Sequence, residues 1–140
     1  MNSPELVIRP YETADEEQVI ELWRRCKLVV PQNDPRKDII LKRQAQPKLF
    51  LIGILEDEIV ATAMAGYEGH RGWINYLAVS PDFRRRGIGR RMMAEAESQL
   101  SALGCPKINV QIRSSNKNVM AFYESLGFSM DEVVSMGKRL

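Results

Sequence analysis

The segment 77-LAVSPDFRRRGIGRR-91 carries the strongest signal in this chain. An apolar strand runs into a break at Ser80-Pro81-Asp82, and a helix begins near Gly87. Free N–H groups and the partial positive charge of a helix N-terminus bind phosphate oxygens. Gly87 and Gly89 let the backbone approach a pyrophosphate closely, and five arginines in the same segment add positive potential. The segment therefore predicts a phosphate-binding turn.

The glycine spacing separates this turn from other phosphate loops. A Walker A loop needs a Lys-Ser or Lys-Thr pair after its second glycine, where Arg90-Arg91 stands here. A dinucleotide fingerprint needs a third glycine at the position of Met92. What fits is Arg-x-x-Gly-x-Gly, matched by Arg84, Gly87 and Gly89. Taken alone, the segment is equally typical of a solvated arginine face on a tight turn.

The residues before this segment alternate between strand and helix patterns. The predicted elements are a strand at Leu6–Arg9, an amphipathic helix at Ala14–Lys27, a second helix from Asp34-Pro35 to Ala45, and strands at Leu49–Leu55, Ile59–Tyr67 and Trp73–Val79. Thr13 and Glu16 form a candidate capping box for the first helix. Asp34 followed by proline marks the start of the second helix. The three consecutive strands predict an antiparallel meander.

The residues after the turn complete a mixed sheet. A long helix at Gly87–Leu103, a strand at Ile108–Ile112, a last helix capped by Ser115 or Asn116, and two short strands in the tail Phe128–Leu140 are expected. Strand, helix and strand over residues 73–112 predict a parallel crossover. The fold class is therefore α/β, an α+β mixed and mostly antiparallel sheet with one splayed parallel pair and about four helices.

Composition narrows the functional classes. The chain has 140 residues, 44% of them hydrophobic, which fits a single domain over residues 1–140. A net charge of +2 is too small to predict a nucleic-acid or membrane partner. Two cysteines and one histidine favour a reducing compartment and provide no ordinary zinc site, so no metal is expected. There is neither a signal core nor an apolar run of about 20 residues, and we expect a cytoplasmic protein.

The element order and two segments, 76-YLAVSPDFRRRGIGRRMM-93 and 114-SSNKNVMAFYESLGF-128, resemble the GCN5-related N-acetyltransferase (GNAT) superfamily. The resemblance covers nearly the whole chain, and the two segments in this order are a specific signal. The local sequence is also similar to the bacterial YpeA-like branch. The resemblance implies a GNAT-like acyl-CoA N-acyltransferase fold and acetyl-CoA as the acetyl donor.

The resemblance also implies a set of cofactor-binding residues. The turn would bind the CoA pyrophosphate through the backbone of Arg84, Arg85, Arg86, Gly87, Ile88, Gly89 and Arg90. The preceding strand, Leu77, Ala78 and Val79, would pair its backbone with the pantetheine arm. Asn116 would hydrogen-bond the pantetheine, and Tyr123 would lie close to the thioester sulfur.

The chemistry of acetyl transfer assigns roles to some of these groups. An amine attacks the thioester carbonyl, an amide near Val79 stabilises the oxyanion, and Tyr123 protonates the leaving thiolate as general acid. A lysine-type amine, with a pKa of ~10.4, must first lose a proton. The strand Trp73–Val79 lacks the carboxylate that many GNAT enzymes use as base. Glu68 and His70, just before it, are the candidate bases, although both suit a turn equally well and bulk-connected water is the alternative.

The predicted function is transfer of acetyl from acetyl-CoA to the primary amine of a small molecule, protein or peptide, by direct attack in a ternary complex. The resemblance places the acceptor pocket at Trp23–Asp38, where Asn33 and Asp34 can hold an ammonium, while Trp23 itself suits the core. One alternative is a GNAT-like sensor that binds acetyl-CoA without turnover. A nucleic-acid binder using the arginines ranks last, because interleaved aromatic residues are missing. A homodimer remains open.

Overall fold

A computed structural model describes residues 5–140 of the chain. The chain falls into two compact units, one ending at Val110 and the other beginning at Gln111. The first unit contains a sheet and helices α1 to α3, and the second contains helix α4 and the C-terminal tail.

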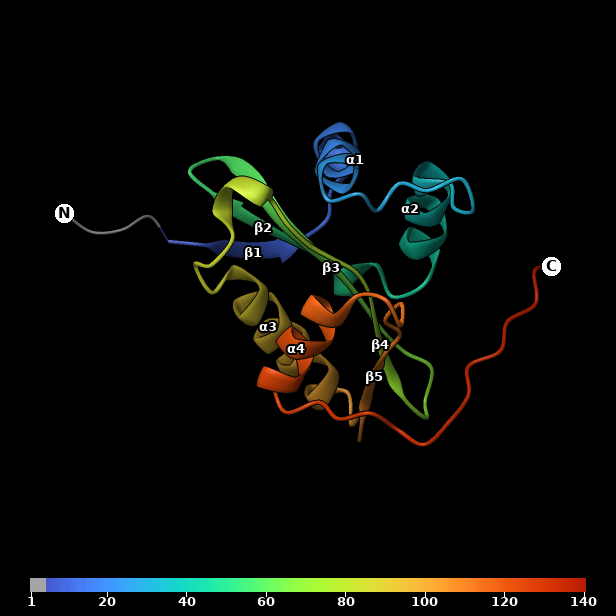
Figure 1. Cartoon of the computed structure of the whole chain (residues 1–140). Helices are drawn as coiled ribbons and strands as arrows, with labels where there is room; N and C mark the ends of the chain where they lie inside the picture. Colours follow the sequence, from blue (N-terminus) through green and yellow to red (C-terminus); the bar gives the residue numbers. More distant parts are fainter. Residues whose placement is uncertain (1–4) are drawn as a thin grey trace. The chain divides into compact units, whose positions relative to one another are not determined.

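A five-stranded sheet forms the centre of the first unit (Figure 1). Its strands follow the order of the chain: β1 (Val7–Pro10), β2 (Phe50–Leu55), β3 (Glu58–Tyr67), β4 (Gly72–Val79) and β5 (Ile108–Val110). Strands β1 to β4 pair antiparallel, and β5 pairs with β4 in parallel. The predicted antiparallel meander with one parallel crossover is confirmed.

Helices cover both faces of this sheet. Helices α1 (Glu16–Arg25) and α2 (Pro35–Gln44) lie on one face and α3 (Ile88–Ala102) lies on the other (Figure 1). The first face holds a core cluster that includes Val19, Ile20, Leu22, Trp23, Ile39, Phe50 and Ile52. Helix α3 packs closely on the second face, since a Cβ added to Gly53 would lie 2.9 Å from Met92 Sδ and 3.1 Å from the Ala61 Cβ.

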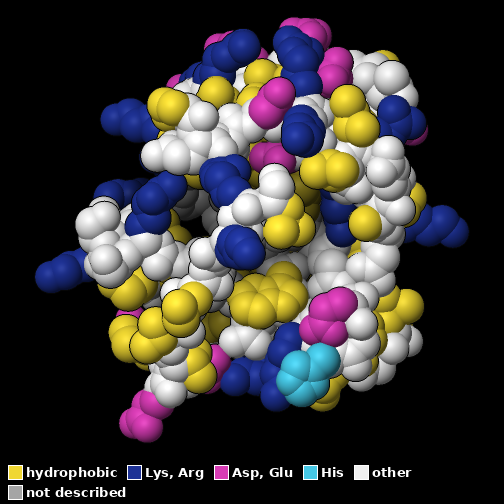
Figure 2. Space-filling model, turned by 90° about the vertical axis from the view of Figure 1, so that its right-hand side faces the viewer, with side chains coloured by type: hydrophobic (Ala, Val, Ile, Leu, Met, Phe, Trp, Pro, Cys, Tyr) yellow, Lys and Arg dark blue, Asp and Glu magenta, His cyan; other side chains and the backbone are white. Residues whose placement is uncertain are grey.

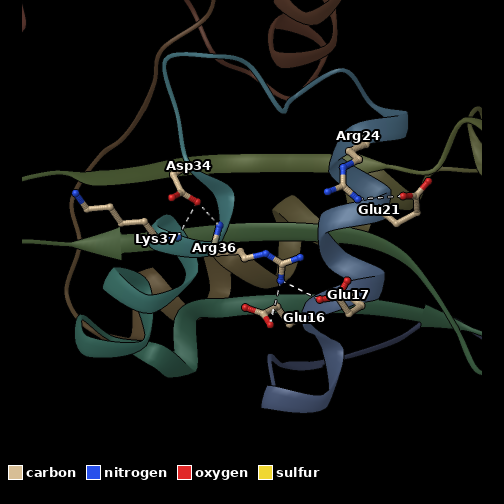
Figure 3. A network of polar contacts seen from close by, with 7 residues as sticks. All are labelled: Glu16, Glu17, Glu21, Arg24, Asp34, Arg36 and Lys37. Atoms are coloured by element: carbon tan, nitrogen blue, oxygen red, sulfur yellow. Dashed lines mark hydrogen bonds and ion pairs between the residues drawn. The ribbon is translucent and has the colours of Figure 1, made fainter.

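Polar contacts join α1 to α2, as Figure 3 shows. Asp34 Oδ1 accepts hydrogen bonds from the N–H groups of Arg36 (3.1 Å) and Lys37 (3.3 Å), which confirms the predicted cap of α2. The Arg36 guanidinium lies 3.3 Å from the Glu16 carboxylate and 2.8 Å from that of Glu17. Exposed ion pairs contribute only about 0–1 kcal/mol each, so these contacts orient α2 more than they stabilise the fold.

The start of α1 differs from the prediction. Thr13 lies in a short 3₁₀ turn (Thr13–Asp15), and Glu16 is already the first residue of α1, so their predicted capping box is wrong. Asp15 instead accepts the Glu12 N–H (2.8 Å). The Arg9 guanidinium donates to both oxygens of Asp15 (2.7 and 2.9 Å) and holds the pKa of this buried carboxyl below its usual range. The cap is therefore formed one residue earlier than predicted, between Glu12 and Asp15, and Arg9 adds an ion pair to it.

Lys42 on α2 and Gln46, just after this helix, protect an edge of β3, which continues beyond its last pair with β2. The Gln46 side chain accepts the Tyr67 N–H (2.8 Å) and donates to the Tyr67 carbonyl (3.0 Å), as a neighbouring strand would. Lys42 Nζ donates to the Ala65 carbonyl, and burial lowers the pKa of Lys42. These backbone groups are therefore satisfied without a further strand.

The second unit contains α4 (Lys117–Ser125). Between the two predicted caps, Asn116 is the residue at the helix start, and its Oδ1 accepts the Val119 N–H (3.3 Å). After α4, Gly127 adopts a left-handed φ of 94°, a conformation that favours glycine. The predicted last helix is confirmed.

The two short strands expected in Phe128–Leu140 are not formed, and this prediction is wrong. Val133 and Val134 are adjacent, so a strand would turn them to opposite faces. Both are exposed, by 77% and 88%, and Met136 by 92%. Without a pairing strand to bury one face, the apolar residues of the tail do not establish a register.

Over residues 5–140, no helix combines the length and the apolar character needed to cross a bilayer. In the same residues, no group of three or more His, Cys, Asp and Glu side chains is arranged to hold a metal ion.

Candidate active site

The phosphate turn begins where β4 ends. The Ser80 N–H donates to the Val60 carbonyl on β3 (2.7 Å), and the buried Ser80 Oγ accepts the Asp82 N–H (3.4 Å) at the start of a short 3₁₀ turn. Arg25, the last residue of α1, donates to Asp82 (2.7 Å) and to Ser80 Oγ (3.3 Å). The exit of β4 is thus fixed both to the sheet and to α1.

The backbone then reverses into α3 with its N–H groups free. Arg85 and Gly87 adopt left-handed φ values of 65° and 74°. Among residues 5–140 no side chain caps α3, and the bond from the Arg91 N–H to the Gly87 carbonyl (3.0 Å) closes its first turn. The N–H groups of Ile88 and Gly89 precede that bond, so they have no partner within the helix. This end of α3 can accept phosphate oxygens.

The arginines of the turn keep their charge available. Arg84, Arg85, Arg86 and Arg90 are exposed, and none of them forms an ion pair with another residue in the range 5–140. The Arg86 guanidinium lies 5.2 Å from the centre of the Phe83 ring, a cation–π contact. Positive charge therefore gathers around the start of α3.

The basic side chains elsewhere show no comparable grouping on the face seen in Figure 2. Lys and Arg side chains lie there among acidic and apolar ones, without a continuous basic area. A nucleic-acid interface normally needs a basic patch or stripe. The arrangement on this face does not support the hypothesis of a nucleic-acid binder.

Strand β4 has an open edge next to the turn. Its pairing with β5 covers Gly72, Trp73 and Ile74 and stops there. Because the Ser80 N–H points to β3, strand alternation directs the backbone groups of Val79 to the opposite edge. The Cys26 thiol donates to the Val79 carbonyl (3.3 Å). An extended ligand arm can pair with the backbone at this edge.

A β-bulge interrupts β4 beside this open edge. The register with β3 shifts between the pairs Thr62–Ala78 and Met64–Asn75. Tyr76 adopts a left-handed φ of 49°, which is rare for a bulky residue in a strand. No local pattern in the sequence predicts this bulge, because the shift arises from pairing with β3 and not from a local glycine.

Glu68 and His70 occupy the connection from β3 to β4. The Glu68 carboxylate accepts the N–H groups of His70 and Arg71, both at 2.6 Å, and both candidate bases are exposed. These backbone hydrogen bonds, first that of Arg71, lower the pKa of Glu68. The turn-forming role that the sequence left open is therefore present.

Tyr123 lies on α4 in the second unit. Its ring is buried, with the ring centres of Phe122 and Phe128 each 5.2 Å away in edge-on contact, and burial raises the pKa of its hydroxyl to about 12. Over residues 5–140 this hydroxyl has no hydrogen bond, and no fully buried side-chain N or O atom lacks a partner. The hydroxyl is therefore reached by solvent, although its ring is not.

Comparison with known proteins identifies relatives of this chain. Residues 16–128 match the acetyltransferase (GNAT) family. Acetyltransferase SG1711 from Sodalis glossinidius (strain morsitans) is 46% identical over 134 residues, which cover 95% of this chain and 94% of the relative.

Solved structures show the same fold. The PaiA N-acetyltransferase from Thermoplasma acidophilum, in complex with coenzyme A, matches with a TM-score of 0.79 at 18% identity, over 93% of each chain. The aminoglycoside N-acetyltransferase AAC(6′)-Iy, in complex with the bisubstrate analogue CoA-S-monomethyl-acetylneamine, gives 0.77 at 20% identity, over 97% of this chain and 99% of the other. The YpeA-like branch stays a prediction. The chain belongs to the GNAT family of acetyltransferases and is an acyltransferase.

Proposed function

We propose that this enzyme transfers the acetyl group of acetyl-CoA to a primary amine by direct attack in a ternary complex, with residues 1–140 acting as one domain. The observation that carries the proposal is the uncapped start of α3, lined by arginines free of ion pairs, at the end of the open-edged β4. The family match spans residues 16–128, which include parts of both units.

The donor site follows from this end of α3. The pyrophosphate is assigned to the backbone of Arg84, Arg85, Arg86, Gly87, Ile88, Gly89 and Arg90, and the pantetheine arm to Leu77, Ala78 and Val79. Asn116 is assigned to the same arm. Its Oδ1 caps α4, which leaves its amide hydrogens to donate to a pantetheine carbonyl. The CoA bound to the PaiA relative supports this choice of donor.

The reaction needs no covalent enzyme intermediate. The amine nitrogen bonds to the thioester carbon, the C–S bond breaks, and the amine gives up one proton. A backbone N–H of β4 near Val79 stabilises the oxyanion, the Tyr123 hydroxyl gives its proton to the departing thiolate, and solvent water then returns a proton to Tyr123. A pKa of about 12 keeps this hydroxyl protonated at every physiological pH.

The proton of the amine has two candidate destinations. Glu68 and His70 remain proposed bases, but the two backbone hydrogen bonds and the lowered pKa make the Glu68 carboxylate a weak one. Both side chains are exposed. We therefore favour bulk-connected water as the acceptor of this proton.

The acceptor is a small-molecule amine or the amine of a protein or peptide. The AAC(6′)-Iy relative carries a CoA–acetylneamine analogue, which joins donor and acceptor in one molecule and supports direct attack. In this chain the acceptor side is assigned to the connection from α1 to α2. Asn33 is exposed there, whereas the Asp34 carboxylate already caps α2.

Acetyl-CoA is expected to stabilise the folded protein. At 100 times its Kd a ligand adds ~2.7 kcal/mol to the free energy of unfolding, or roughly 5–10 °C in Tm for a domain of this size. Desulfo-CoA should act nearly as well, because most contacts are to phosphate and pantetheine. Thermal melts with millimolar ligand measure both, and an unchanged Tm would argue against the donor site.

An amine library tests transfer itself. Release of free thiol from acetyl-CoA, measured with and without each amine, should reveal at least one acceptor class. Binding of acetyl-CoA with no thiol release for any small-molecule, peptide or protein amine would favour the sensor over the transferase.

The pH profile is expected to rise from neutral to alkaline pH without falling. The free amine becomes more abundant up to its pKa of ~10.4, whereas Tyr123 loses its proton only near pH 12. Between pH 7 and 10, kcat/KM should therefore increase or level off. A descending limb below pH 10 that disappears in the Tyr123→Phe variant would keep Tyr123 as the acid but contradict its raised pKa.

A further inference from the structure

The left-handed Tyr76 at the β4 bulge is held by side chains from three other elements. A bulky residue with φ of 49° costs about 1–3 kcal/mol and persists only where its surroundings enforce it. This strained residue directly precedes Leu77, Ala78 and Val79, the strand residues assigned above to the pantetheine arm and, near Val79, to the oxyanion. The side chains that hold Tyr76 in this conformation can therefore affect the rate of acetyl transfer.

The first support comes from the core. Trp23 Nε1–H on α1 donates to Thr62 Oγ1 on β3 (2.9 Å), and the Thr62 hydroxyl donates in turn to the Tyr76 carbonyl (2.8 Å). Thr62 and Trp23 are both fully buried. A single hydroxyl thus links α1 and β3 to the backbone of the strained residue.

The second support acts on the Tyr76 ring. The ring stacks on Trp23 with centres 3.9 Å apart and planes 17° from parallel. Its hydroxyl donates to Asp38 Oδ2 on α2 (2.6 Å). Burial and this hydrogen bond raise the pKa of Tyr76, so the hydroxyl stays a donor. Backbone, ring and hydroxyl of one residue are each fixed by a different partner.

We propose that the set Trp23, Thr62, Tyr76 and Asp38 is a positioning network that holds the β4 bulge so that the adjacent backbone amides point at the thioester carbonyl. None of the four needs to touch the reacting atoms. The inference rests on the proposed function, because it assumes that acetyl-CoA lies along β4. To that function it adds a set of residues in the first unit that affect kcat without contacting the substrate.

Disruption of this network should lower kcat by a measurable amount. Removing an oxyanion donor typically costs 10²–10³ in kcat, and misplacing a group by 1 Å can cost about 10²-fold. Relaxation of Tyr76 toward an ordinary strand conformation would turn the following amide away. Donor binding should change little, because the pyrophosphate turn is built from other residues.

The test compares Thr62→Val with Thr62→Ser. Valine has the shape of threonine but cannot support the Tyr76 carbonyl, whereas serine keeps the hydroxyl. We expect Thr62→Val to lower kcat about 10²-fold with acetyl-CoA Kd within about 3-fold, and Thr62→Ser to restore most of the rate. If Thr62→Val does not fold, Tyr76→Phe replaces it, with an expected loss of about 10-fold in kcat.

A spectroscopic measurement makes the test independent of the acceptor. The carbonyl ¹³C resonance of [1-¹³C]acetyl-CoA should move downfield on binding to the wild type, because hydrogen bonds polarise the carbonyl. It should return toward its free position in Thr62→Val and Tyr76→Phe. Tyr11→Phe is the matched control, since the Tyr11 ring stacks on Phe50 and lies outside the network.

Two Asp38 variants distinguish a positioning role of this residue from an effect of its negative charge. The Asp38→Asn variant keeps an oxygen that accepts the Tyr76 hydroxyl, so the ¹³C shift of bound [1-¹³C]acetyl-CoA should stay near its wild-type position, whereas Asp38→Ala should move it toward the free position about as far as Tyr76→Phe does. An equal displacement in both Asp38 variants would assign the effect to the charge and overturn the network.

The outcomes distinguish this inference from the function on which it rests. Lowered Tm with unchanged kcat and unchanged ¹³C shift in the Thr62→Val and Tyr76→Phe variants would make the network merely structural and overturn the inference alone. Failure of the wild type to bind acetyl-CoA would overturn the proposed donor site, and the inference with it.

Discussion

Gly89→Glu is expected to weaken acetyl-CoA binding by at least about 100-fold while the fold survives. Gly89 is in the first turn of the uncapped α3, where its N–H is free of helical bonds. A carboxylate about 4 Å from a phosphate charge costs several kcal/mol even at an effective dielectric constant of about 20. Isothermal titration with acetyl-CoA measures the loss directly.

The same substitution should not harm the helix. A carboxylate near a helix N-terminus is favourable by about 0.3–1 kcal/mol, and φ at Gly89 is not in the left-handed range. The Tm without ligand should therefore be unchanged or slightly higher. Lost binding together with an intact Tm identifies the turn as the phosphate site.

Two control variants separate the effect of a negative charge at position 89 from that of a charge elsewhere on α3 and from that of added bulk. Ala94→Glu adds the same charge to an exposed position further along α3 and should leave affinity within about 3-fold. Gly89→Ala adds only a methyl group, so it should bind acetyl-CoA less tightly than wild type yet more tightly than Gly89→Glu. Affinity unchanged in all three variants would remove the pyrophosphate from this turn.

The layout of the sheet was predictable because its signals are local. Each strand of the meander is bounded by its own turn residues, and the break at Ser80-Pro81-Asp82 separates β4 from α3. The cap at Asp34 is equally local. The predicted cap at Thr13 is wrong by one residue, because Glu12 and Asp15 form the capping box and Arg9 on β1 pairs with Asp15 as well.

The site was predictable in part. The glycine turn was found because free N–H groups at a helix start depend on a few consecutive residues. Tyr76 and Asp38 were missed because they are 38 positions apart and meet only after α2 packs on the sheet. The bulge that gives Tyr76 its left-handed φ depends on pairing with β3. Such features come from tertiary structure, which periodicity does not encode.

Tyr123→Phe is expected to lower kcat by roughly 10²–10⁴-fold, the usual contribution of a positioned general acid. Phenylalanine keeps the ring that meets Phe122 and Phe128 edge-on, so the fold and acetyl-CoA affinity should hardly change. The loss should fall on kcat more than on KM, because the hydroxyl acts mainly in the transition state. Steady-state kinetics with an acceptor from the amine screen provide the measurement.

The pKa of about 12 at Tyr123 determines how readily its proton can reach the thiolate. A thiol such as that of CoA has a pKa of ~8.5 in water. Complete transfer from Tyr123 to a fully solvated thiolate would therefore be unfavourable by about 5 kcal/mol. On the proposed mechanism the thiolate is released beside the buried Tyr123 ring, where poor solvation would raise the pKa of the thiol and narrow the gap between the two pKa values.

The proposed mechanism therefore has the proton of Tyr123 move as the C–S bond breaks, and a solvent deuterium isotope effect on kcat is expected in the wild type. Tyr11→Phe, which removes another tyrosine hydroxyl, should keep both the rate and the isotope effect. If Tyr123→Phe keeps them too while pre-steady-state kinetics show that chemistry limits the rate, then water protonates the thiolate and Tyr123 serves only as a packed aromatic residue of α4.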